Sequence, residues 1–146
     1  MLDPAKGSAW TRAADQVGGL DGQAQPPGLA LGAGGVMAVG PTGVVAAVAV
    51  DADELTVVDP ATGTRTVPLG RDIETAAVTV VGDQPVVLDA ERSELITADG
   101  EAHALGDAAG AVLQQPGGSA DGVLVATDTA LLDVPLAGGA PEPLGE

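Results

Sequence analysis

The side chains that could best take part in chemistry are carboxylates in two short turns. Asp51, Asp53 and Glu54 fall within four residues, and Asp89 and Glu91 occupy the corresponding turn of the next unit of the sequence. Carboxylate oxygens are hard ligands that suit Ca²⁺, so Asp51, Asp53 and Glu54 are the candidate metal ligands. The spacing of an EF-hand loop is missing, and short acidic turns commonly hold no metal. We therefore predict no bound cofactor, with calcium as the alternative.

The other reactive side chains do not form catalytic sets in the sequence. There is one histidine, His103, and no cysteine, whereas a zinc site needs several such ligands. His103 alternates with alanines on an expected outer strand and is predicted to be a solvated surface residue. Ser8, Ser93 and Ser119 all fall in turns, where a hydroxyl bonds the local backbone. The glycine-rich stretch from Gly32 to Gly35 lacks the helix and lysine of a phosphate loop. We predict no catalytic residue.

Two further features are candidates for ligand contact. Trp10 is the sole aromatic residue. It is predicted to fill a gap among small side chains, and stacking on a ligand is the alternative. The segment from Ala13 to Gly28 is an insertion relative to the later repeats. Long loops often carry binding residues, although a plain surface excursion is the simpler interpretation.

Composition and charge exclude several classes of partner. The 146 residues are compatible with a single domain, residues 1–146. A formal charge of −16 opposes contact with phosphate backbones and anionic membrane surfaces, so we expect no nucleic acid partner. No apolar span reaches the length that crosses a bilayer, so no membrane insertion is expected. With no cysteine, the redox compartment is undetermined.

A repeated pattern defines the elements that must position these residues. Leu-Gly closes each unit at glycines 32, 70, 106 and 145, which are 38, 36 and 39 residues apart. One blade of a β-propeller has roughly 40 residues in four strands. In the clearest unit, Val44 to Val50 is a small and β-branched run typical of a buried strand, Glu54 to Asp59 is a second strand, and Arg65 to Leu69 alternates like an outer strand.

The repeat predicts an all-β protein made of antiparallel four-stranded blades of a partial β-propeller. Residues 1–32 form a half-blade with an insertion loop at 13–28, and residues 33–70, 71–106 and 107–146 form three blades. About three and a half blades are fewer than the roughly four to eight that close a ring. Exposed blade faces promote association, so self-association that completes the propeller is expected.

The first residues match a turn found later in the chain. Asp3 to Ser8 reads D-P-A-K-G-S, and Asp59 to Thr64 reads D-P-A-T-G-T. Asp-Pro and Gly at these positions favour a tight turn. The match predicts that the chain begins inside a blade, at the turn between its last two strands, and that it is a piece of a longer protein.

These turn motifs resemble those of YVTN-type, surface-layer and quinoprotein-type β-propellers, in which V-D-P-A-T-G-T or a near match precedes the outer strand. More narrowly, Leu2 to Trp10, Leu31-Gly32 and Val57 to Pro60 are similar to the extracytoplasmic propeller-like region of large actinobacterial proteins that carry fibronectin type III domains. The resemblance covers nearly the whole chain. It implies an exported, cell-envelope-associated protein without enzymatic activity.

Two classes of function follow. The first is a binding or scaffold module of the cell envelope, whose partner is a protein or a cell-wall polymer. The alternative is a fragment of a propeller enzyme, lactonase-like or quinoprotein-like, whose active site draws on all blades. The lack of His and Arg clusters on the expected inner strands favours the binding module.

Overall fold

The computed structural model describes residues 2–3, 6–10, 28–118 and 121–145, and the chain is all-β over these ranges. No α-helix occurs in them, which confirms that the fold is all-β, as predicted. The strands are β1 (Leu2–Asp3), β2 (Ser8–Ala9), β3 (Leu29–Ala30), β4 (Val36–Val39), β5 (Val45–Ala49), β6 (Glu54–Asp59), β7 (Gly63–Pro68), β8 (Ala76–Val81), β9 (Gln84–Asp89), β10 (Glu94–Thr97), β11 (Ala102–Ala104), β12 (Val112–Leu113), β13 (Gly122–Ala126), β14 (Leu131–Pro135) and β15 (Glu142–Pro143).

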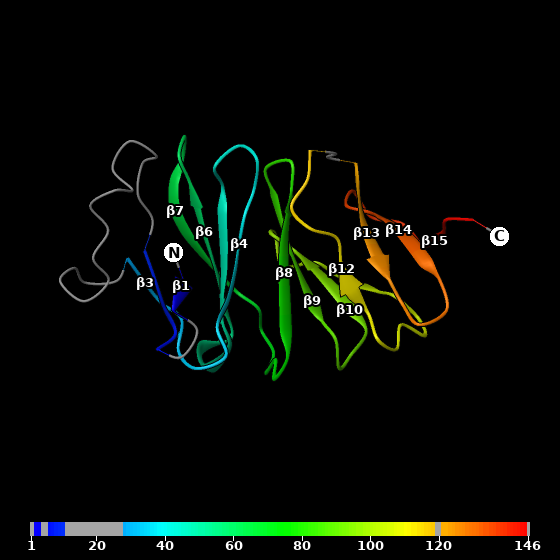
Figure 1. Cartoon of the computed structure of the whole chain (residues 1–146), viewed down its shortest axis with the longest axis horizontal. Coiled ribbons are helices and arrows are strands. Elements are labelled where there is room, and N and C mark those ends of the chain that lie inside the picture. Colours follow the sequence, from blue (N-terminus) through cyan, green and yellow to red (C-terminus); the bar gives the residue numbers. More distant parts are fainter. Residues whose placement is uncertain (1, 4–5, 11–27, 119–120, 146) are drawn as a thin grey trace.

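The strands form four antiparallel sheets, each a simple meander. Sheet I has the order β1-β2-β3, sheet II β4-β5-β6-β7, sheet III β8-β9-β10-β11 and sheet IV β12-β13-β14-β15. The sheets follow one another in chain order along the long axis of the molecule (Figure 1). Short turns connect the strands within sheets II and III, as expected for sequential antiparallel neighbours.

Successive side chains along a strand point to opposite faces of its sheet, so alternate apolar residues pack against the two neighbouring sheets. In sheet II, Ala46 and Val48 lie in a cluster with Val80 and Val87 of sheet III. Ala47, between them on β5, instead packs with residues of sheet I. The continuous apolar run on β5 is thus explained by burial on both faces, and all five of its residues are buried.

Sheet III repeats this arrangement toward sheet IV. Val86, Leu88 and Leu95 lie in one cluster with Val123 and Val125 of sheet IV. These five side chains are at most 1% exposed. Complete burial of a Val or Leu side chain contributes roughly 1.5–3 kcal/mol, so the junctions between sheets hold the fold together without aromatic residues.

The Leu-Gly pairs have a shared structural role. Leu69 donates its N–H to the carbonyl of Asp53 at 2.8 Å, and Leu105 donates to Ser93 at 2.8 Å. Asp53 and Ser93 directly precede the third strands of sheets II and III, and both have a positive φ, of 52° and 53°. The leucine therefore extends the pairing between the third and fourth strands by one residue. Its side chain turns toward the next sheet.

The same hydrogen bond corrects the predicted start of the chain. Leu31 donates its N–H to the carbonyl of Gly7 at 2.6 Å, and Gly7 directly precedes β2. In sheet I, β2 therefore corresponds to a third strand and β3 to a fourth. The turn at residues 3–8 lies between a second and a third strand, and the prediction that it joins the last two strands is wrong.

Sheet I also differs from the predicted half-blade. It has three strands, and the predicted insertion at 13–28 falls between β2 and β3, within the sheet rather than after it. All of the insertion except Gly28 lies outside the described residues. The turn motif gave the wrong prediction because Asp-Pro-x-x-Gly suits several kinds of hairpin. Only the pairing partner of Leu31 shows which two strands this turn joins.

Candidate functional site

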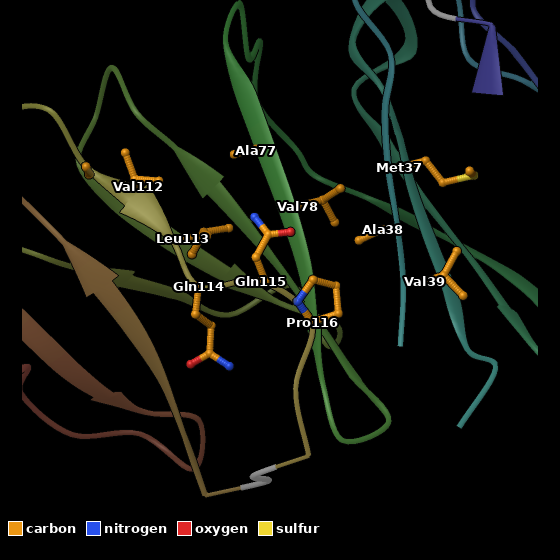
Figure 2. Close-up of a pocket in the computed structure, with 11 residues that line it drawn as sticks. Met37, Ala38, Val39, Ala77, Val78, Val112, Leu113, Gln114, Gln115 and Pro116 are labelled. Carbon is orange, nitrogen blue, oxygen red and sulfur yellow. The ribbon is translucent and has the colours of Figure 1, made fainter. Parts of the chain in front are cut away.

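The first strands of three sheets line the candidate site, an open groove of about 510 Å³. Figure 2 shows its wall, with β4 and β8 side by side and the β12 segment beyond them. The lining residues are Met37, Ala38, Val39, Ala77, Val78, Ala111, Val112, Leu113, Gln114, Gln115 and Pro116. The groove therefore runs across the sheets, along the edge where each meander begins.

Strand order determines what the groove offers to a ligand. β4, β8 and β12 each end a sheet, so each has one edge without a strand partner in its own sheet. At the end of β8 that edge is used: Gly117 donates its N–H to Val80 O at 3.1 Å, and Gly82 donates to Gly117 O at 2.7 Å. This parallel bridge shows that the edge of β8 accepts extended backbone. No such bridge is found along β4 in the described residues.

The chemistry of the lining is apolar with two amides. Val39 and Val112 are 52% and 61% exposed, which is high for large aliphatic side chains. Gln114 uses its Oε1 to accept the N–H of Leu124 at 2.8 Å. The eleven lining residues include no titratable side chain. The groove can provide apolar contact and hydrogen bonds, but its lining offers no general acid, base or nucleophile.

The predicted calcium ligands lie at another place, in the turn between β5 and β6. Asp51 lies in a short 3-10 turn (Val50–Ala52), Asp53 follows it and Glu54 begins β6. Asp53 Oδ1 accepts the N–H of Ile73 at 3.3 Å, so this carboxylate fixes the link between sheets II and III. In the described part of the chain, no three His, Cys, Asp or Glu side chains are grouped as a metal site. The structure thus gives calcium no support there.

The equivalent turn of sheet III holds an ion pair. Asp89 is fully buried, and its Oδ2 lies 2.9 Å from Nη1 of Arg92. Asp89 Oδ1 also accepts the N–H of Arg92 at 3.2 Å, and Arg92 donates to the carbonyl of Asp72 at 2.8 Å. The hydrogen bond with Asp89 raises the pKa of Arg92. Asp89 therefore organises a turn, and Glu91 beside it is exposed.

Hydrogen bonds also set the acidity of two turn residues. The Ala61 N–H, with help from the Thr62 hydroxyl, lowers the pKa of Asp59. The hydroxyl of Thr97, assisted by the Glu101 N–H, lowers the pKa of Asp99. Both carboxylates cap turns between third and fourth strands. Their shifts stabilise the ionised form and indicate a structural role.

The remaining candidates are dispersed. His103 is half-buried on β11, paired with Leu95, and its Nε2 is buried without a hydrogen-bond partner. The prediction of a solvated surface histidine is wrong for this ring nitrogen, because His103 shares the face of sheet III that packs on sheet IV. Ser8 lies in β2 of sheet I, Ser93 lies in the turn before β10, and Ser119 is outside the described residues. Trp10 is buried at 6% exposure, which fits the predicted packing role.

Sequence reasoning missed the groove itself. Its residues are aliphatic and scattered over three repeats, so no motif marks them. The signal that was available is the first strand of each unit, since a strand order known from the repeat places these strands on one edge.

Comparison of the chain with protein families, with curated proteins and with solved structures finds no match. The described residues include no helix of the length and apolarity required to cross a bilayer.

Proposed function

We propose that the chain is a non-enzymatic binding or scaffold module, built as part of a β-propeller and working at the cell envelope. Three observations support the propeller: the units follow each other in one direction, each full unit has the same strand order, and both faces of sheets II and III are buried by neighbouring sheets. First strands on one edge correspond to the inner wall of a propeller channel.

The groove is the proposed contact surface, and its lining is the observation on which the function depends. Aliphatic side chains with a small number of amides are typical of binding sites, in which apolar area gives affinity and polar groups give orientation. The free edge of β4, and that of β8 before the bridge to Gly117, suit a partner in extended form, because backbone hydrogen bonds can then continue the sheet. The proposed partner is accordingly a protein segment, with a cell-wall polymer as the second probe.

The test compares binding to two probes, an immobilised library of ten-residue extended peptides and purified cell-wall sacculi. Val39→Asp places a charge in the groove at an exposed position, and Thr64→Asp places the same charge on the exposed outer strand β7. We expect binding to at least one probe, weakened at least tenfold by Val39→Asp and unchanged by Thr64→Asp.

Binding to neither probe, or equal effects of the two variants, would refute the assignment of the groove. Turnover of a lactone substrate by the purified chain would refute the non-enzymatic part of the proposal. Export is tested separately, by fractionating cells that carry the native gene. Recovery of the protein only in the cytoplasmic fraction would contradict a role at the envelope.

A further inference from the structure

One end of the groove is closed by backbone contacts around Val80. Gly117 donates its N–H to Val80 O and accepts the N–H of Gly82, which holds the segment after β12 against β8. On the other side, a Cβ on Gly40 would lie 2.6 Å from Cγ1 of Val80, so the chain after β4 also meets β8 closely at this point. The groove is therefore bounded at the ends of the three first strands, and its lining extends toward their beginnings.

A proline explains why the segment after β12 leaves its own sheet. Gln114 still pairs with β13, donating its N–H to Leu124 O at 2.9 Å, and its side-chain Oε1 accepts the Leu124 N–H in place of a backbone carbonyl. The next position that would donate to β13 is Pro116, which has no N–H. The chain crosses to β8 at Gly117 instead. The edge of β8 before Val80 is left without a strand partner.

The backbone of Val78 is the free hydrogen-bonding position on this edge. The N–H and C=O groups of alternate residues point to the same side of a strand, so Val78 presents its pair to the groove as Val80 does. Among the described residues, no hydrogen bond reaches this pair. The exposed amide of Gln115 lines the groove with Val78 (Figure 2), and it too has no hydrogen-bond partner in the described chain. An extended peptide backbone beside β8 can bond with both.

Exposed carboxylates flank both ends of this apolar edge. Glu74 lies two residues before β8, and Asp83 lies in the turn after it. Asp128 donates its backbone N–H to Ala109 O at 3.0 Å, which places it close to the start of β12. These carboxylates do not line the groove, but their field attracts a cationic partner to it.

The cations of the chain do not offset this charge near the groove. No Lys or Arg follows Arg92 in the sequence, whereas nine Asp and Glu residues do. Arg71 and Arg92 are held in ion pairs, and Arg65 donates to the carbonyl of Ala98. Lys6, the remaining Lys or Arg in the described residues, lies in the turn between β1 and β2. The surroundings of the groove therefore favour a partner of positive charge.

We infer that the groove binds an extended, cationic protein segment, with its backbone on the edge of β8 and its Lys or Arg side chains flanking an apolar centre. This inference rests on the proposed function of the groove and names the class of partner. Apolar side chains of the segment contact the exposed Val39 and Val112, and its backbone bonds with Val78. Attraction between opposite charges speeds the encounter and makes it sensitive to salt.

Fluorescence anisotropy with three labelled seven-residue peptides tests the charge and the backbone contact. The peptides are the cationic K-V-T-V-T-V-K, the anionic E-V-T-V-T-V-E, and a copy of the cationic peptide with its central amides N-methylated. We expect the full chain to bind the cationic peptide at least tenfold more tightly than either of the others. Its affinity should fall at least fivefold as NaCl rises from about 0.05 M to about 0.5 M, because salt screens the attraction.

A matched pair of variants locates the apolar contact. Val39→Lys places a cation in the groove and should weaken binding of the cationic peptide at least tenfold. Thr64→Lys makes the same change of charge on the exposed strand β7 and should alter binding less than twofold. In the complex, hydrogen exchange followed by NMR should show the Val78 N–H protected relative to the free chain.

A second pair locates the charge. Glu74→Gln/Asp128→Asn removes two carboxylates beside the groove and should weaken binding of the cationic peptide at least threefold. Glu101→Gln/Glu142→Gln removes the same charge from exposed positions at the outer edges of sheets III and IV and should change it less than twofold. Equal effects of the two double variants would contradict the placement of the cationic side chains.

The outcomes separate this inference from the function on which it rests. Failure of every peptide to bind would refute the groove as a peptide site. Equal affinity for the cationic and anionic peptides, with binding still weakened by Val39→Lys, would overturn the inference and leave the groove as a binding site. Cationic binding that neither N-methylation nor Val39→Lys weakens would show attraction to the surface alone and would also overturn it.

Discussion

Replacement of Leu69 by alanine, compared with replacement of Leu144, tests the claim that junctions between sheets stabilise this protein. The two residues have the same type, the same place in the repeat and the equivalent backbone hydrogen bond. They differ in exposure, 5% against 45%, because sheet III covers Leu69. The comparison therefore isolates burial between sheets from the local role of the Leu-Gly pair.

The expected magnitudes follow from the surroundings of each side chain. Leu69 packs with Leu55, Val57, Ile73 and Val80, all at most 5% exposed, so its truncation leaves a cavity. Leu→Ala changes at such sites cost about 2–5 kcal/mol. Exposed surface substitutions usually change stability by about 0.5 kcal/mol or less, and the partial exposure of Leu144 places it near or slightly above that range.

The assay is urea unfolding followed by far-ultraviolet circular dichroism and by the fluorescence of Trp10, the only tryptophan. Protein concentrations are kept where sedimentation shows monomer, so that association does not cover Leu144. For a chain of this size, each kcal/mol corresponds to about 2–4 °C in the melting temperature. Leu69→Ala should therefore melt about 4–20 °C lower, and Leu144→Ala within a few degrees of the parent.

Equal losses for the two variants would refute the reasoning. They would mean that the leucine acts through its own hairpin and that packing of sheet II on sheet III contributes little. A loss at Leu69 below about 1 kcal/mol would have the same meaning, since it is smaller than the transfer free energy of the removed atoms.

Two other outcomes are expected. Arg92→Met removes the cation beside the buried carboxylate of Asp89 and should lower stability in urea unfolding more than Arg71→Met, whose partner carboxylate Glu94 is 28% exposed. Equal losses for the two variants would contradict the role of the buried carboxylate. Because hydrogen bonds lower the pKa of Asp59 and Asp99 in the folded chain, their contribution to stability is present above the unfolded pKa of about 4 and is lost as pH falls through the folded values. The Asp59→Asn/Asp99→Asn variant should show a flatter loss of stability between about pH 5 and pH 2.5 than the parent, and identical curves would refute the assignment.

Much of the secondary structure could be predicted from sequence because each strand carries its own pattern. The strand from Glu54 to Asp59 has the predicted bounds. Alternation, β-branched residues and glycine turns are local features, so a single repeat contains enough information to place them. The antiparallel meander follows from the short connections between these strands.

The turn at residues 3–8 shows where local information ends. Its letters match those of the turn at 59–64, yet Gly7 pairs with Leu31 as Asp53 pairs with Leu69. A turn motif specifies a hairpin but not its position in a sheet. That position is shown by the pairing of Leu31, which follows the insertion at residues 13–28. The sequence pattern alone therefore predicted the wrong hairpin.

The sequence by itself determined an all-β chain of repeating antiparallel strands with a core of small aliphatic residues, because strand pattern and turn chemistry are read within a few residues. Only the tertiary structure decided which faces are covered. It buries Leu69 and exposes Leu144, takes Nε2 of His103 out of solvent, and brings β4, β8 and β12 together as one groove. The physical reason is that exposure depends on the neighbouring sheet, which the residue's own repeat does not encode.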